Sequence, residues 1–123
     1  MRELFFATLY LFIYSMSFSQ NIAGSWKGNI DANGNIIPIV FHLFKDTSGQ
    51  INGKWDSPKQ KAMGLPFSKI SVEKDSVFLE IKMIGGSYTG KFVGKDSIAG
   101  MWHQGGGEIV LNLSRSYETE SVG

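Results

Sequence analysis

The chain has 123 residues, a formal net charge of +1 and no cysteine, so it has the length of a single domain and cannot form a disulfide or use a thiol nucleophile. Acidic and basic residues are interspersed along it, which excludes the concentrated basic face typical of nucleic-acid-binding proteins. Fifteen glycines and only three prolines favour a sheet with many tight turns.

Residues 1–19 have the pattern of a signal peptide. A charged start is followed by the apolar run from Leu4 to Phe18, and Ser17 and Ser19 are the small residues that signal peptidase prefers before its cut. The run is shorter than the ~20 residues that span a bilayer, which makes a retained membrane anchor the weaker alternative. We therefore expect a secreted or periplasmic protein whose mature chain begins at Gln20 and has no stable membrane span.

Alternation of apolar and polar residues predicts strands from Gly24 to Asp31 and from Ile36 to Lys45, joined by a tight turn at Asn33–Gly34. The second strand directs four apolar side chains inward, namely Ile37, Ile39, Phe41 and Leu43. Its outward face is unusually apolar for a surface and carries Val40, His42 and Phe44. An apolar strip among polar neighbours is a candidate partner surface.

A third strand is predicted from Gln50 to Asp56, followed by an irregular connection. From Leu65 to Glu73 the apolar positions change phase near Ser68, and a β-bulge is the expected cause. The next segment has the most regular apolar face of the chain, formed by Val77, Leu79, Ile81 and Met83.

Three further strands are predicted, over Ser87–Val93, Ile98–His103 and Glu108–Ser114. The sequence thus predicts an all-β domain over residues 20–115 and a polar, frayed tail over residues 116–123. About eight antiparallel strands favour an up-and-down, lipocalin-like barrel, with a two-sheet β-sandwich as the alternative. An eight-stranded barrel has an interior that side chains fill or that holds one small ligand.

The pattern Ile-x-Gly-x-aromatic occurs four times. Its copies are Ile22–Trp26, Ile51–Trp55, Ile84–Tyr88 and Ile98–Trp102. In a strand these three positions share one face, so each copy sets a glycine beside a large ring and leaves room for the ring to lie across the backbone. Five aromatic residues are therefore expected to face inward, where they either fill the core or line a ligand cavity: Trp26, Phe41, Trp55, Tyr88 and Trp102.

Four stretches together resemble the N-terminal β domain that precedes the catalytic domain in many secreted bacterial α/β-hydrolases and esterases. They are Gly24–Gly28, Ile39–Leu43, Asp56–Pro58 with Gly64–Pro66, and Gly100–Gly106. The resemblance covers residues 22–115 and none of that family's catalytic residues, so it implies a lipocalin-like barrel that accompanies a hydrolase domain and does not itself catalyse.

No motif in the chain indicates catalysis or metal binding. Gly86–Gly90 has a serine, Ser87, but lacks the spacing and the following helix of a nucleophile elbow. His42 and His103 have no further patterned ligands for zinc, and both lie on the outward side of their strands. Asp56–Pro58 is interpreted as a strand end whose Asp or Ser caps a loop, with the polar rim of a pocket as the alternative. We expect no catalytic residue, no metal and no cofactor.

These observations favour a secreted, non-catalytic β-barrel accessory or interaction module. Its expected partners are a hydrolase domain, another copy of the chain or another envelope protein. The alternative is a lipocalin-like protein that binds a small apolar ligand inside the barrel.

Overall fold

The computed structural model describes residues 21–117, so the predicted signal peptide and residues 118–123 of the predicted tail lie outside the described part of the chain. The described part is all-β, as predicted, and its 3₁₀ helices are single turns. The elements in chain order are β1 (Gly24–Ala32), β2 (Asn35–Lys45), β3 (Ile51–Ser57), η2 (Pro58–Gln60), β4 (Ala62–Pro66), β5 (Lys69–Glu73), β6 (Ser76–Ile81), η3 (Lys82–Ile84), β7 (Gly86–Phe92), β8 (Ser97–Gln104), β9 (Gly107–Val110) and β10 (Leu113–Ser116).

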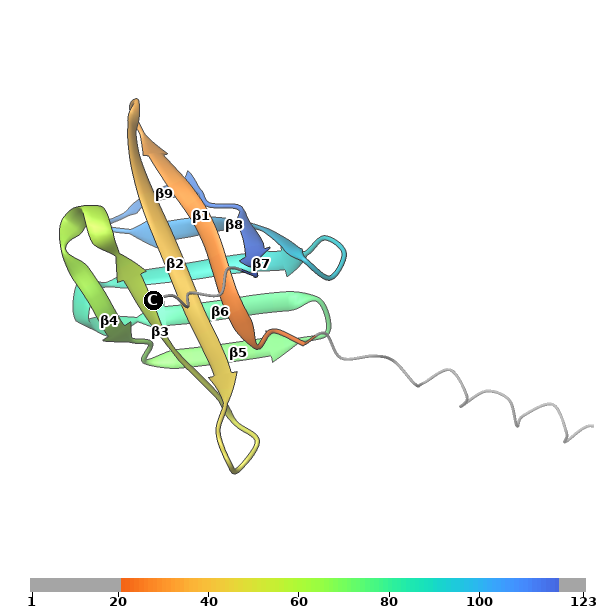
Figure 1. The fold of residues 1–123 in the computed structure, drawn as a ribbon. Helices are drawn as coiled ribbons and strands as arrows, with labels where there is room; N and C mark the ends of the chain where they lie inside the picture. The colour runs from red at the N-terminus through yellow and green to blue at the C-terminus, as the bar shows by residue number, and fades with distance from the viewer. Residues whose placement is uncertain (1–20, 118–123) are drawn as a thin grey trace, which may run out of the picture.

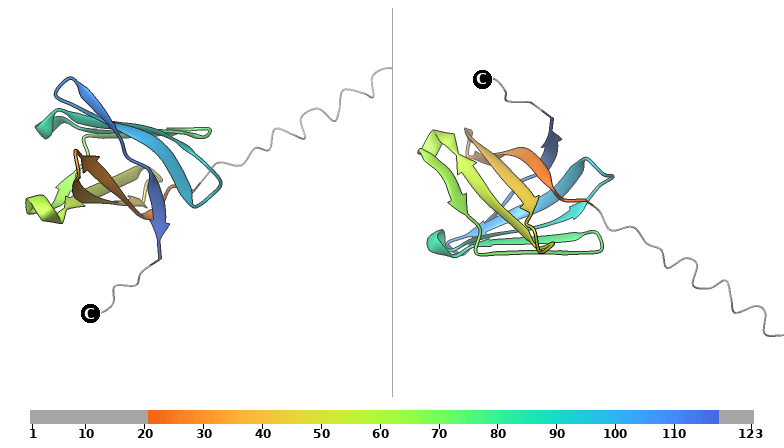
Figure 2. Two further views of the ribbon diagram at one scale, coloured as in Figure 1. Left: turned by 90° about the horizontal axis from the view of Figure 1, so that it is seen from above. Right: turned by 60° about the horizontal axis from the view of Figure 1, so that its bottom comes forward.

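All ten strands belong to one antiparallel sheet with the order β4-β3-β2-β1-β10-β8-β7-β6-β5, and β9 pairs with β8 beside this path. The sheet folds over on itself, so that β1, β2 and β3 cross β5, β6, β7 and β8 steeply and the core lies between the two layers (Figure 1, Figure 2). Its two edges are β4 and β5, and the sheet is not closed between them. The antiparallel all-β fold is confirmed, whereas closure into a barrel is not.

The phase change near Ser68 is a crossing between the layers and not the expected bulge. The backbone N–H of Phe67 donates to the carbonyl of Gly53 in β3 (3.3 Å), and the next N–H, of Ser68, donates to the carbonyl of Glu80 in β6 (2.7 Å). Consecutive residues therefore pair with opposite layers. Because each layer has its own inward direction, the apolar pattern shifts phase where the chain passes from one to the other.

Two other predicted strands differ from the structure: one ends early and one is broken in two. Met83 is 64% exposed, because the chain leaves β6 after Ile81 and makes the single turn of η3. The segment predicted as one strand from Glu108 to Ser114 is two strands, β9 and β10. At the break, the Asn112 side chain accepts a hydrogen bond from the N–H of Gly100 (3.2 Å), and β10 passes between β8 and β1. This insertion breaks the simple up-and-down order.

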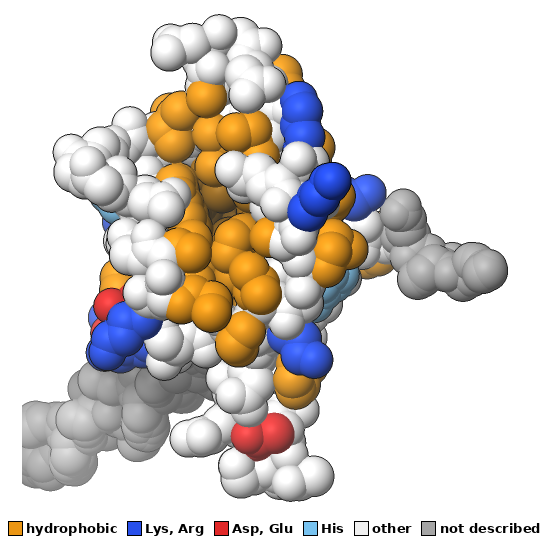
Figure 3. Space-filling view, turned by 90° about the vertical axis from the view of Figure 1, so that its left-hand side faces the viewer, with side chains coloured by type: hydrophobic (Ala, Val, Ile, Leu, Met, Phe, Trp, Pro, Cys, Tyr) orange, Lys and Arg blue, Asp and Glu red, His pale blue; other side chains and the backbone are white. Residues whose placement is uncertain are grey.

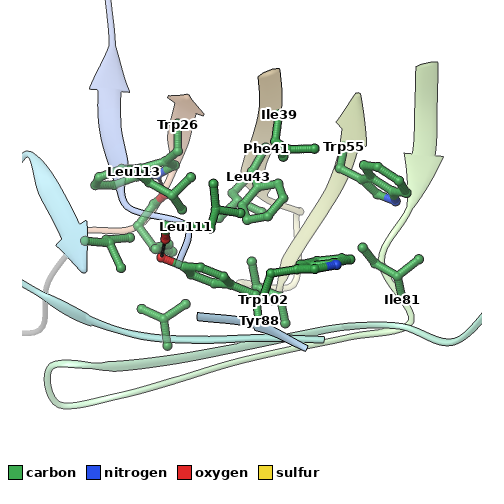
Figure 4. Close-up of a cluster of buried hydrophobic side chains, with 14 of the residues drawn as sticks. Trp26, Ile39, Phe41, Leu43, Trp55, Ile81, Tyr88, Trp102, Leu111 and Leu113 are labelled. Atoms are coloured by element: carbon green, nitrogen blue, oxygen red, sulfur yellow. Dashed lines mark hydrogen bonds between the residues drawn. The ribbon is translucent and has the colours of Figure 1, made fainter. Parts of the chain in front are cut away.

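The repeated glycine-aromatic pattern forms the centre of the core, as Figure 4 shows. Tyr88 of β7 pairs with Trp102 of β8, and each ring lies across a glycine of the other strand. A Cβ at Gly100 would lie 2.3 Å from the Tyr88 hydroxyl oxygen, and a Cβ at Gly86 would lie 2.6 Å from the Trp102 ring. These two glycines are therefore needed for close approach, although each makes room for the ring of the neighbouring copy and not, as expected, for the ring of its own copy.

The C-terminal strand is fastened to the N-terminal one by Arg115, whose role the sequence analysis missed. Its guanidinium carbon lies 4.3 Å from the centre of the Trp26 ring, and one Nη donates to the carbonyl of Ala23 (2.8 Å). Its Nε donates to the carboxylate of Asp96 (3.1 Å), which also accepts from the Tyr117 hydroxyl (2.7 Å). Strand β10 extends through Ser116, so regular structure reaches just beyond residue 115.

Candidate functional site

The interior between the two layers has a filled half and a hollow half. In the filled half, Trp26 packs edge-on against Phe92 at 6.0 Å, and Phe41 packs edge-on against Tyr88 at 5.6 Å. In the other half, Trp55 and Trp102 lie 6.4 Å apart with their rings tilted by 46°. A pocket of about 300 Å³ opens beside these two tryptophans.

The walls of this Trp55–Trp102 pocket come from both layers and from both 3₁₀ turns. Apolar side chains supply most of the lining, which consists of Ile30, Ile37, Ile39, Trp55, Ala62, Leu65, Ile84 and Trp102, together with the amides Gln60 and Gln104. Figure 3 looks onto this end of the molecule and shows hydrophobic side chains gathered in a hollow. A concave, mainly apolar lining with a few polar groups is the usual composition of a small-molecule site.

The polar groups of the pocket are held in fixed positions. The Trp102 indole N–H donates to Oε1 of Gln104 (3.0 Å), whose Nε2 donates to the carbonyl of Ile84 (3.0 Å). Across the pocket, Oε1 of Gln60 accepts from the hydroxyl of Ser57 (2.7 Å). These bonds orient both amides and fix the two turns that frame the opening, so the pocket is largely pre-formed.

Trp55 differs from the other tryptophans because its indole N–H is buried and finds no acceptor within the described part of the chain. The N–H of Trp26 donates to the carbonyl of Ile22 (2.9 Å), and that of Trp102 donates to Gln104. A buried donor without a partner costs about 1–3 kcal/mol. Such groups are rare in folded proteins, and because this N–H is covered by protein atoms it is a local cost in the packing around Trp55.

All five aromatic residues expected to face inward are buried, but only some of them line the pocket. Trp55 and Trp102 line the pocket, whereas Trp26, Phe41 and Tyr88 fill the core. The Tyr88 hydroxyl donates to the carbonyl of Leu111 (2.8 Å), and burial raises the pKa of this phenol far above its ordinary value. The tyrosine therefore remains neutral and structural.

The pocket also contains residues that the sequence analysis had not assigned to a site. Ile37 and Ile39 are expected only as core, and the sequence does not single out Ile30, Gln60 or Gln104. Gln60 lies in η2, where the sequence has no apolar alternation. Gln104 is the last residue of β8, on the same side as Trp102 and one residue beyond the predicted strand, so the alternation could have indicated it.

The strip Val40, His42 and Phe44 lies on the outward face of β2, as expected, and Phe44 is 46% exposed. His42 links three strands. Its Nδ1 lies 3.0 Å from the hydroxyl oxygen of Ser25 in β1, and its Nε2 lies 2.9 Å from Oδ2 of Asp56 in β3. The other oxygen of Asp56 accepts the backbone N–H of Gly64 (2.6 Å), so Asp56 caps the following loop as the sequence indicated.

Ser25, His42 and Asp56 have the connectivity of a hydrolytic triad, but their surroundings differ from those of a catalytic site. Ser25 lies in β1, which is paired on one side with β2 and on the other with β10. The backbone N–H groups around it are committed to these ladders, whereas an oxyanion hole needs donors aimed at the reacting carbonyl. The imidazole side chain is also 46% exposed. The arrangement is best explained as a polar link across three strands.

The other residues considered as catalytic or metal-binding groups do not lie together in one cluster. Nε2 of His103 lies 3.0 Å from the Thr89 hydroxyl oxygen on the outer face of the second layer, and Ser87 lies in β7. Residues 21–117 contain no group of three or more His, Cys, Asp or Glu side chains placed to hold a metal ion. Within the same residues, no helix is long and apolar enough to cross a membrane.

Comparisons of the chain with profiles of known protein families, with curated proteins and with solved structures return no match.

Proposed function

We propose that the protein is a secreted, non-catalytic β-sheet module that binds a small apolar ligand in the Trp55–Trp102 pocket. The observation that carries this proposal is the pocket itself, with about 300 Å³ of space between two tryptophans and six aliphatic side chains. Removing apolar surface from water contributes about 25 cal/mol per Å², so a ligand that fills such walls gains affinity chiefly by burial.

The size of the pocket restricts the ligand. Small-molecule sites range from about 300 to 1,000 Å³, so this pocket is at the lower end. It suits a compound of up to about three rings or a short aliphatic chain. The amides of Gln60 and Gln104 in the lining favour a ligand that also carries a hydrogen-bonding group.

The proposal is tested with the neutral fluorophore N-phenyl-1-naphthylamine, whose emission rises in an apolar environment. The wild-type protein should bind it saturably, and Ala62→Leu should weaken binding at least about tenfold, because the added carbons enter the pocket. Ala99→Leu makes the same exchange at an exposed position of β8 and should bind as the wild type does. Absence of saturable binding, or equal binding by both variants, would refute a ligand function for this pocket.

A second proposed role is association with a hydrolase domain or another envelope protein through the strip Val40, His42 and Phe44. It is supported by the exposure of Phe44, although the strip alone is far smaller than the ~800 Å² per partner of a standard interface. The double variant Val40→Thr/Phe44→Thr should then lose a partner that the wild type retains in pull-downs from envelope extract. Identical partners and identical light scattering for both proteins would contradict this role.

A further inference from the structure

The segments that frame the Trp55–Trp102 pocket also carry large apolar side chains on their outer side. Ile36, Met63 and Met83 are 43%, 60% and 64% exposed, and each lies within two residues of a pocket-lining residue. Three of the seven exposed large hydrophobic residues among the described ones thus belong to one end of the molecule. A concentration of exposed apolar side chains around a pocket opening indicates contact with another apolar phase.

Lysines accompany these apolar residues. Lys59 and Lys61 lie in and just after η2, and Lys82 lies in η3. The framing segments 33–38, 57–66, 82–87 and 104–107 contain these three lysines and no acidic residue, while the carboxylates of Asp31 and Asp56 beside them accept the backbone N–H groups of Gly34 and Gly64. Figure 3 shows cationic side chains standing around the apolar hollow. One of them is fixed, because Nζ of Lys59 donates to the carbonyl of Ile36 (2.9 Å) in the β1–β2 hairpin.

We propose that this end of the molecule docks on an anionic lipid surface, so that the pocket opens toward the membrane and takes its apolar ligand from there. The source of the ligand rests on the proposed function, whereas the docking itself does not. Exposed methionine and isoleucine side chains would enter the boundary between headgroups and acyl chains, and the lysines would remain among the headgroups.

The composition of this end favours a lipid surface over a protein partner. Protein interfaces are enriched in methionine but depleted in lysine, whereas anionic bilayers attract each lysine near their surface. The gain is about fivefold in affinity for each lysine, so three lysines together account for about a hundredfold preference for anionic over neutral lipid. Because this attraction is electrostatic, binding should weaken as the salt concentration rises.

The experiment measures sedimentation of the protein with phosphatidylcholine vesicles that contain about 30% phosphatidylglycerol, against vesicles of phosphatidylcholine alone. The wild type should bind the anionic vesicles preferentially. Lys61→Gln/Lys82→Gln should bind them about 25-fold more weakly. The matched control Lys91→Gln/Lys95→Gln removes the same charge far from the pocket, near the C-terminal end of β7 and in the turn that follows it. Its affinity for anionic vesicles should stay within about twofold of that of the wild type. The wild type and all variants have the same N-terminus, so a difference in binding between them reports on the substituted residues.

A second variant separates the apolar from the electrostatic contribution. Met63→Ser/Met83→Ser should weaken binding to anionic vesicles while leaving its salt dependence unchanged. The fluorophore titration without vesicles should be unaffected in Lys61→Gln/Lys82→Gln, so loss of docking and loss of ligand binding are distinguishable. The proposal would be overturned if the wild type did not bind vesicles, if it bound neutral vesicles equally well, or if both lysine variants lost binding equally. Selective binding of a protein by this end of the molecule would also contradict it and indicate a protein partner.

Discussion

The contact between Gly100 and Tyr88 gives a stringent test of the core. A methyl group at residue 100 would lie 2.3 Å from the tyrosine oxygen, 2.4 Å from Cζ and 2.5 Å from the carbonyl of Thr89. All three distances are well below van der Waals contact, and the last involves backbone, so the ring must move. Gly100→Ala should therefore strain the core and break the hydrogen bond from Tyr88 to the buried carbonyl of Leu111.

The two effects can be added approximately. Overpacking a well-filled core costs about 1–3 kcal/mol, and an unsatisfied buried carbonyl costs about 1–3 kcal/mol more. We expect Gly100→Ala to lower the free energy of unfolding by about 2–6 kcal/mol, a large part of the ~5–15 kcal/mol of a small domain. Urea denaturation followed by tryptophan fluorescence measures the change. Gly107→Ala is the control, since its Cβ would meet only one atom, at 3.8 Å, and should be nearly neutral. A loss below about 1 kcal/mol for Gly100→Ala would refute the arrangement of ring and glycine.

Three further predictions concern the same fold. Trp26→Ala should cost about 3–5 kcal/mol in urea denaturation, because the ring is fully buried and leaves a cavity, and a cost below about 1 kcal/mol would contradict its central position. Arg115→Lys should cost about 1–3 kcal/mol, because an ammonium cannot reproduce the guanidinium bonds to several backbone carbonyls, and an unchanged midpoint would argue against the clamp. Hydrogen bonds from the Tyr117 hydroxyl first, and then from Arg115, hold the pKa of Asp96 below its usual value of 3.8. The carboxylate therefore stabilises the fold fully above about pH 4, and this stabilisation is lost as the pH falls through the lowered pKa. Asp96→Asn should therefore flatten the acid limb of the stability profile measured by circular dichroism, and an unchanged limb would show that Asp96 does not contribute.

Local patterns in the sequence predict the strands well. The β1–β2 hairpin follows from clean alternation and an Asn-Gly turn, and its observed register pairs Ala32 with Asn35 around that turn. The inward position of Trp55 and Trp102 follows from the same alternation. These features depend on neighbours in the chain, which a sequence displays directly.

The differences arise where distant segments decide the structure. The corner between Phe67 and Ser68 looks like a bulge in the sequence, because a change of layer and an extra residue shift the apolar phase in the same way. Strand β10 separates from β9 because Asn112 bonds to Gly100, a partner 12 residues away. Arg115 lies in a polar segment, and its packing on Trp26 requires the first and last strands to be neighbours.

The candidate pocket was predictable only in part, for the same reason. Alternation indicates which aromatic rings face inward, but not which of them find packing partners. Phe67 packs edge-on against Phe41 at 5.2 Å and helps to fill one half, whereas the side chains around Trp55 and Trp102 leave a space. Whether an interior is filled or hollow depends on the summed volumes of side chains from every strand.

The most direct test of the ligand pocket uses the indole N–H resonances of the three tryptophans in a ¹⁵N-labelled sample. Trp55 and Trp102 line the pocket, whereas the N–H of Trp26 is bonded to Ile22 in the filled half and serves as an internal control. Addition of N-phenyl-1-naphthylamine should shift the Trp55 and Trp102 signals along a common saturation curve and leave that of Trp26 in place. Three unchanged signals at saturating ligand, or equal shifts of all three, would contradict a binding site between Trp55 and Trp102.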